Sequence, residues 1–180
     1  MKTTQSIIIV SPSDLLIVSD MQEGFRSAEA ESLIPMLERL CGVFTGHIVF
    51  TEFYNRRGSR FERQLNWRRF QNATDISLLL ELQHLSGKAI RHSGYTLINK
   101  PMKKLISSLA NPKVFLTGIY TDVCITKTAM DLFDHDVETY VIADACHSLH
   151  GQAIHETALI SLGHILGKDH IINSDQLNCT

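Results

Sequence analysis

The chain has 180 residues, 44% of them hydrophobic, and this length suits one compact domain with a sizeable core. A formal net charge of -2 argues against a nucleic-acid partner or an acidic membrane surface. No apolar run approaches the ~20 residues of a bilayer-spanning helix, and the N-terminus shows no signal-peptide pattern. We therefore expect a single cytoplasmic domain over residues 1–180, with a small-molecule substrate and no nucleic-acid or membrane partner.

Short apolar runs alternate with segments of helical periodicity along the chain. The runs expected to form strands lie at residues 7–10, 15–19, 47–51, 88–92 with 95–100, 114–118, 137–144 and 170–174. The segments expected to form helices lie at residues 32–44, 75–85, 101–109, 121–133 and 150–166, with a further short helix inside a long polar segment at 51–72. This alternation predicts an α/β fold with a parallel sheet covered on both faces.

The polar segment contains a basic cluster with interleaved aromatic residues, RRGSRFERQLNWRRF at 56–70. Its composition resembles that of an RNA-binding patch. We favour a polar loop followed by a surface helix, placed over the edge of the sheet where substrate loops tend to lie.

Cys124 is the first candidate for chemistry. It lies in the first turn of a predicted helix, directly after the strand at 114–118, and ligands bind at this edge of an open α/β sheet. The free N–H groups and dipole of a helix start favour a thiolate. A lone buried cysteine is commonly an inert small hydrophobe, but its position leads us to favour a nucleophile. The other cysteines, Cys41, Cys146 and Cys179, form no C-x-x-C pair and no secreted disulfide framework.

Two further ionisable residues end predicted strands, Asp20 after residues 15–19 and Lys100 after 95–100. A carboxylate within reach of a thiol can act as its base, and a lysine would stabilise both the carboxylate and the thiolate. Backbone N–H groups at the helix start could receive an oxyanion. Taken alone, Asp20 also fits a helix cap and Lys100 a solvated side chain, so periodicity does not select these three residues.

A resemblance does select them. LLIVSDMQEGF, the lysine of LINKP, and LTGIYTDVCITKTAMDLFDHDVETYVIADACHS resemble the isochorismatase-like cysteine hydrolase family, which includes nicotinamidase and N-carbamoylsarcosine amidase. The resemblance implies a three-layer α/β/α sandwich with a mostly parallel, six-stranded, Rossmann-like sheet. It also implies a homodimer or homotetramer.

Carried over to this chain, the family triad is Asp20, Lys100 and Cys124. A cis peptide bond between Ile119 and Tyr120 would turn the amides of Tyr120 and Cys124 toward the oxyanion. In the implied mechanism Asp20 takes the thiol proton, and Cys124 attacks an amide, imide or ureido carbonyl to give a thioester. Water activated by Asp20 hydrolyses that thioester, while Lys100 keeps the charges oriented.

Two departures from the family pattern are visible. The metal-binding D-x-H is missing after the second strand, where the chain reads TEFY, so we expect no metal and no other cofactor. The segment after Lys100, PMKKLISSL, lacks the small and aromatic residues that follow the family lysine.

The aromatic residues Phe25, Tyr54, Trp67 and Tyr120 are candidates for the substrate wall, with core packing an equal alternative. A cysteine favours C–N hydrolysis over the vinyl ether hydrolysis of isochorismatases, which needs an acid and no thiol. A catalytically silent binding protein stays an alternative. Redox chemistry between Cys124 and Cys146 is a third, for which the spacing gives no support.

Overall fold

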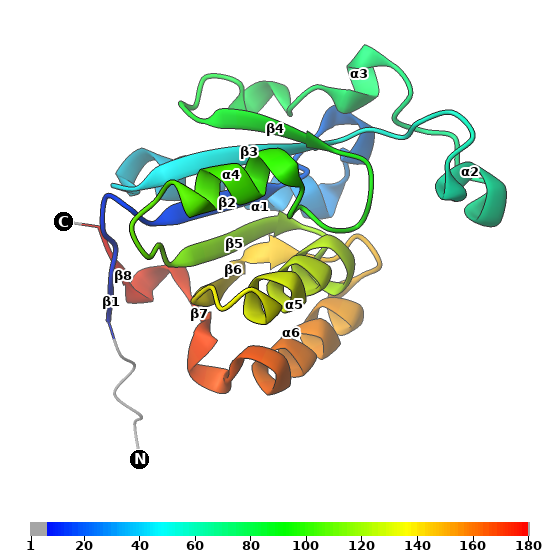
Figure 1. The fold of residues 1–180 in the computed structure, drawn as a ribbon. Coiled ribbons are helices and arrows are strands. Elements are labelled where there is room, and N and C mark those ends of the chain that lie inside the picture. The colour runs from blue at the N-terminus through cyan, green and yellow to red at the C-terminus, as the bar shows by residue number, and fades with distance from the viewer. Residues whose placement is uncertain (1–6, 180) are drawn as a thin grey trace.

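The structure is a computed structural model that describes residues 7–179 (Figure 1). Its central sheet has six strands in the order β4-β3-β2-β5-β6-β7, and every neighbouring pair is parallel. The strands are β2 (Leu15–Ser19), β3 (His47–Phe53), β4 (Lys88–His92), β5 (Val114–Ile119), β6 (Thr139–His147) and β7 (Ile171–Ile172). The α-helices are α1 (Ala28–Val43), α2 (Arg60–Leu65), α3 (Ala73–Ile76), α4 (Lys100–Ser107), α5 (Thr126–Asp134) and α6 (Gln152–Leu166).

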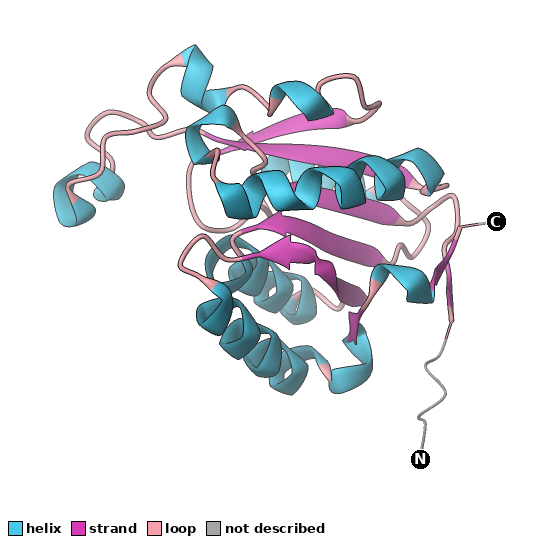
Figure 2. Ribbon diagram, turned by 180° about the vertical axis from the view of Figure 1, so that it is seen from behind, coloured by secondary structure: helices cyan, strands magenta, loops and turns pink. Residues whose placement is uncertain are grey.

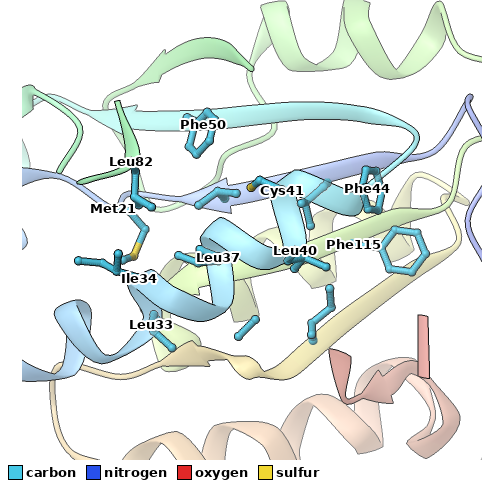
Figure 3. Packing of buried hydrophobic residues seen from close by; sticks show 14 of the residues in the cluster. Met21, Leu33, Ile34, Leu37, Leu40, Cys41, Phe44, Phe50, Leu82 and Phe115 are labelled. Carbon is cyan, nitrogen blue, oxygen red and sulfur yellow. The ribbon is translucent and has the colours of Figure 1, made fainter. Parts of the chain in front are cut away.

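Helices cover both faces of the sheet. Side chains alternate between the two faces along each buried strand, so each strand presents apolar residues to both sides. On β2, Leu16 and Val18 join the cluster that contains the apolar face of α1, as Figure 3 shows for Leu37 and its neighbours. Leu15 and Ile17 join the opposite cluster, which includes side chains of α4, α5 and α6. Figures 1 and 2 show the same three layers from opposite sides. The predicted three-layer sandwich is confirmed.

Several boundaries differ from those predicted. Helix α1 begins at Ala28, because the Ser27 side chain accepts a hydrogen bond from the Ala30 amide and caps it; Ser32 is not the cap. The helix predicted at 75–85 is instead the short α3 and a 3-10 turn at Leu80–Leu82. Residues 95–98 form no strand, so the edge strand of the sheet ends at His92.

The short run at residues 7–10 also has a different place. It forms β1 (Ile8–Ile9), which pairs with β8 (Leu177–Asn178) outside the central sheet. The chain ends of the described part therefore meet in a separate two-stranded ribbon. Within residues 7–179, no helix is both long enough and apolar enough to cross a membrane.

Candidate active site

Three titratable side chains meet where β2, β4 and β5 end. Asp20 follows β2 directly and takes a left-handed backbone conformation, φ 53°, which aspartate tolerates better than most residues. His92 is the last residue of β4, and Cys124 lies in the turn after β5. All three are buried, with 1%, 3% and 8% of their surfaces exposed. Parallel strands bring them together because their carboxyl ends share one edge of the sheet.

The Asp20 carboxylate is held asymmetrically. The Thr51 hydroxyl on β3 donates to Oδ1 over 2.6 Å, and the His92 Nε2 lies 2.7 Å from the same oxygen. The Asp20 amide donates to the Thr51 hydroxyl over 3.1 Å, which fixes the backbone as well. Oδ2 is buried and has no hydrogen-bond partner among the described residues. One carboxylate oxygen is therefore free to take a proton from a neighbouring group.

Cys124 is placed by a single π-helical turn, Thr121–Ile125, that precedes α5. Turns of this kind are often found at functional sites. Its thiol interacts with the Asp20 carboxylate, and the backbone N–H of Tyr120 hydrogen-bonds its sulfur. The peptide bond between Ile119 and Tyr120 is cis, at the position that the resemblance implied.

Strand β5 approaches β2 closely at Gly118, which has φ +93°. A Cβ there would lie 2.4 Å from the Ser19 carbonyl oxygen, so no other residue fits without displacing β2.

The pKa of Cys124 depends on its burial and on its neighbours. Burial, followed by the negative charge of Asp20, raises the pKa of the Cys124 thiol well above its usual value. The Tyr120 amide lowers the pKa but does not offset these two effects. These effects oppose the helix start, which by itself favours a thiolate, and they favour a thiol beside a carboxylate able to act as its base.

His92 was not predicted from the sequence. Its Nδ1 lies 2.8 Å from the Gly94 carbonyl oxygen and its Nε2 faces Asp20, so both ring nitrogens meet acceptors. Burial alone would lower the pKa of His92, but the charge and hydrogen bond of Asp20 and the Gly94 carbonyl raise it above the usual value. This environment fits an imidazolium cation, which pairs with Asp20 inside the protein.

Lys100 is not where the resemblance placed it. It is the exposed first residue of α4, which is capped by the Asn99 side chain and carries Pro101 in its first turn. Lys100 does not line the cavity beside Cys124, and its side chain makes no hydrogen bond or ion pair within residues 7–179. The reason is that the edge strand ends at His92, and the following loop leads into a helix rather than extending the strand. His92 therefore stands beside Asp20 in place of Lys100.

A cavity of about 390 Å³ opens onto Asp20 and Cys124. Its wall is mainly aromatic and is formed by Phe25, Phe53, Phe61, Trp67, Tyr95 and Tyr120, together with Leu65, Gly94, Val123 and His150. The predicted Phe25, Trp67 and Tyr120 line the cavity, but Tyr54 does not. Phe53 does, and neighbouring residues of an extended chain point to opposite sides, which accounts for the place of Tyr54.

His150 is a further residue that the sequence did not single out. It lines the cavity, its Nδ1 lies 2.7 Å from Asp122 Oδ2, and its ring packs against Tyr120 at 5.1 Å. His150 thus forms part of the cavity wall and is held there by Asp122 and Tyr120.

The described residues contain no group of three or more His, Cys, Asp or Glu side chains placed to hold a metal ion. His92 directs both ring nitrogens at protein acceptors, and Thr51 supplies a single hydroxyl. The site as built can perform acid–base and nucleophilic chemistry with its own side chains.

Removing the charge of Asp20 should separate thiol reactivity from turnover. In Asp20→Asn the Cys124 pKa should fall, because one of the causes that raise it is gone, so alkylation by iodoacetamide at pH 8 should be faster, by about tenfold for each pKa unit. Turnover should fall by about 10²–10⁴-fold, because the base is lost. Alkylation rates by mass spectrometry, with Asp131→Asn on the surface of α5 as control, test this. Slower alkylation in Asp20→Asn would contradict the placement of the two groups.

Comparison with known proteins identifies relatives of this chain. The family model for the isochorismatase domain matches residues 14–168. Ureidoacrylate amidohydrolase RutB of Methylobacterium radiotolerans is 30% identical over 77 residues, which are 43% of this chain and 29% of that protein. The chain thus matches under a third of that relative's length.

Solved structures share the fold. N-carbamoylsarcosine amidase from Thermoplasma acidophilum superposes with a TM-score of 0.74 at 17% identity, over 90% of this chain and 96% of that one. The nicotinamidase of Bacillus subtilis gives a TM-score of 0.75 at 16% identity, over 89% and 99% of the two chains.

Proposed function

Because the chain belongs to the isochorismatase family, we propose that it is a cysteine-dependent hydrolase that cleaves a C–N bond of a small amide, imide or ureido compound. The observation that carries the proposal is the buried Cys124 thiol beside the buried Asp20 carboxylate at the floor of an aromatic-lined cavity. The amidohydrolase and amidase names of the relatives support the same bond class.

The first half of the reaction forms a thioester. Asp20 takes the thiol proton on its partner-free Oδ2, and the sulfur attacks the carbonyl carbon of the substrate. The developing oxyanion is received by backbone N–H groups of Tyr120 and Cys124. Asp20 returns the proton to the leaving nitrogen, which departs as ammonia or an amine. The acyl group stays on Cys124.

The second half releases the acid. Asp20, again a carboxylate, takes a proton from water, and the hydroxide attacks the thioester carbonyl. The C–S bond breaks and the proton passes to the Cys124 sulfur, which restores the thiol. In this scheme His92 takes the role first assigned to Lys100. As an imidazolium on Oδ1 it keeps that oxygen unprotonated and directs proton transfer to Oδ2.

The test is ammonia release from a panel of small amides, imides and ureido compounds, measured with and without a chelator. We expect turnover of at least one class that is insensitive to the chelator. Turnover that the chelator abolishes and added zinc restores would replace the proposal with a metal-dependent mechanism. Hydrolysis of vinyl ethers alone would move the reaction to a different bond.

A further inference from the structure

A second cavity of about 560 Å³ adjoins the catalytic one, and the two share Phe61, Leu65, Gly94 and Tyr95 as lining residues. Its remaining wall is formed largely by four arginines, Arg56, Arg57, Arg60 and Arg63. We call this cavity the arginine groove. It belongs to the basic segment 56–70, which Figure 1 shows projecting from the sheet as an arm around α2.

The arm has a defined internal structure. Ser59 caps α2 by accepting from the Glu62 amide, and its hydroxyl donates to Asn55. Glu62 accepts hydrogen bonds from the Gly58 amide and the Gln71 side chain. Phe61 packs against Phe53 and Tyr95, each at 5.1 Å between ring centroids. The arginines are thus carried on a segment that is anchored to the aromatic wall of the catalytic cavity.

The positive charge of the groove is not neutralised within the described part of the chain. Segment 56–70 holds six arginines and one acidic residue, Glu62, whose oxygens are taken up by Gly58 and Gln71. Within residues 7–179, the guanidinium groups of Arg56, Arg60 and Arg63 make no ion pair or hydrogen bond, and that of Arg57 has only an electrostatic interaction with Glu62. Since the whole chain has a net charge of -2, this positive charge is local to the groove.

We propose that the arginine groove binds an anionic group, a carboxylate or a phosphate, of the substrate whose C–N bond is cleaved at Cys124. This inference rests on the proposed function and specifies its substrate class. The guanidinium fork matches the geometry of these oxyanions. The aromatic wall shared by the two cavities would contact the rest of the substrate. A nucleic acid fits less well, because the groove adjoins a cavity with a mainly aromatic wall and the rest of the chain carries no positive excess.

Three probes with one skeleton test the charge requirement: N-carbamoylglycine, its neutral carboxamide, and the analogue that carries a phosphonate. The single tryptophan of the chain, Trp67, lines the catalytic cavity, so its fluorescence reports binding without turnover. In Cys124→Ala protein we expect at least one anionic probe to bind ten- to hundredfold more tightly than the carboxamide, and the stronger anion identifies the group. The double variant Arg60→Gln/Arg63→Gln should lose about tenfold or more in affinity for that anion and under twofold for the carboxamide.

The control is Arg39→Gln, since Arg39 is exposed on α1 and contacts Met36. Equal affinity for charged and neutral probes would overturn the inference, and so would an equal loss for both in the double variant. If the double variant changes in oligomeric state or in oligonucleotide binding while its affinity for the anion stays that of the parent protein, the arm serves another partner and the inference is overturned. Because binding is measured without Cys124, failure of the proposed reaction would leave this result readable.

Discussion

Cys124→Ala should abolish turnover of every C–N substrate, with a loss of about 10⁴-fold or more, because Cys124 is the only thiol among the described residues that line the cavity. The fold should persist, since alanine removes one buried sulfur at a site that faces a cavity. Steady-state ammonia release and a thermal unfolding scan of the same preparation measure both. Turnover above a few per cent of wild type would show that the reaction does not pass through a thioester on this residue.

Two other cysteines serve as matched comparisons. Cys179→Ala alters a half-buried residue near the chain end and should leave turnover unchanged. Cys146→Ala tests the redox alternative, because Cys146 is buried on β6 and its sulfur faces the Leu116 carbonyl at 3.6 Å. Per folded molecule, Cys146→Ala should retain activity. Loss of activity per folded molecule in Cys146→Ala would favour a thiol pair over a lone nucleophile.

The sequence predicted the layers and two of the three central residues for a clear physical reason. Strands buried on both faces, such as Leu15–Ser19 and Val114–Ile119, read as continuous apolar runs, and Asp20 and Cys124 follow such runs closely. Their meeting point follows from parallel topology alone. The edge strand gives a weaker signal, because most of its exposed positions are polar and Lys88–His92 contains only two apolar residues.

That weak signal explains the error over Lys100. The stretch from Tyr95 to Lys100 has strand-like composition, and the resemblance supplied a lysine for it. The chain instead uses Asn99 to cap α4. A histidine at the end of the actual strand was the available indication, since His92 is the titratable residue that the edge strand delivers to the active edge. The raised pKa of Cys124 could not be predicted, because it depends on burial that only tertiary packing sets.

His92→Phe should lower kcat/KM by about 100-fold or more, because it removes the cation that faces Asp20 Oδ1 and leaves that buried oxygen with Thr51 alone. His92→Lys should restore part of this loss, since it returns a positive charge to the site. The control is His84→Phe, where an exposed histidine lies 3.9 Å from Glu38 on the surface. Equal activity of the Phe and Lys variants would show that His92 acts through packing rather than charge.

The pH profile distinguishes a charge role from a structural one. The titratable groups that face His92 are Asp20 and, across that carboxylate, Cys124, whereas Arg91 points outward to Glu52. The folded pKa of His92 is raised, so the cation is present below it and is lost as pH rises through it. Wild-type kcat/KM should therefore fall on the alkaline side above the usual histidine value of about 6.5.

The same sign holds for stability. The His92–Asp20 pair should contribute fully to stability below the unfolded histidine pKa and lose its contribution as pH rises through the folded one.

In His92→Lys the alkaline fall in kcat/KM should move upward, toward the usual lysine value of about 10. An unmoved alkaline limb in His92→Lys would assign that limb to another group, and would remove His92 as the cation of the site.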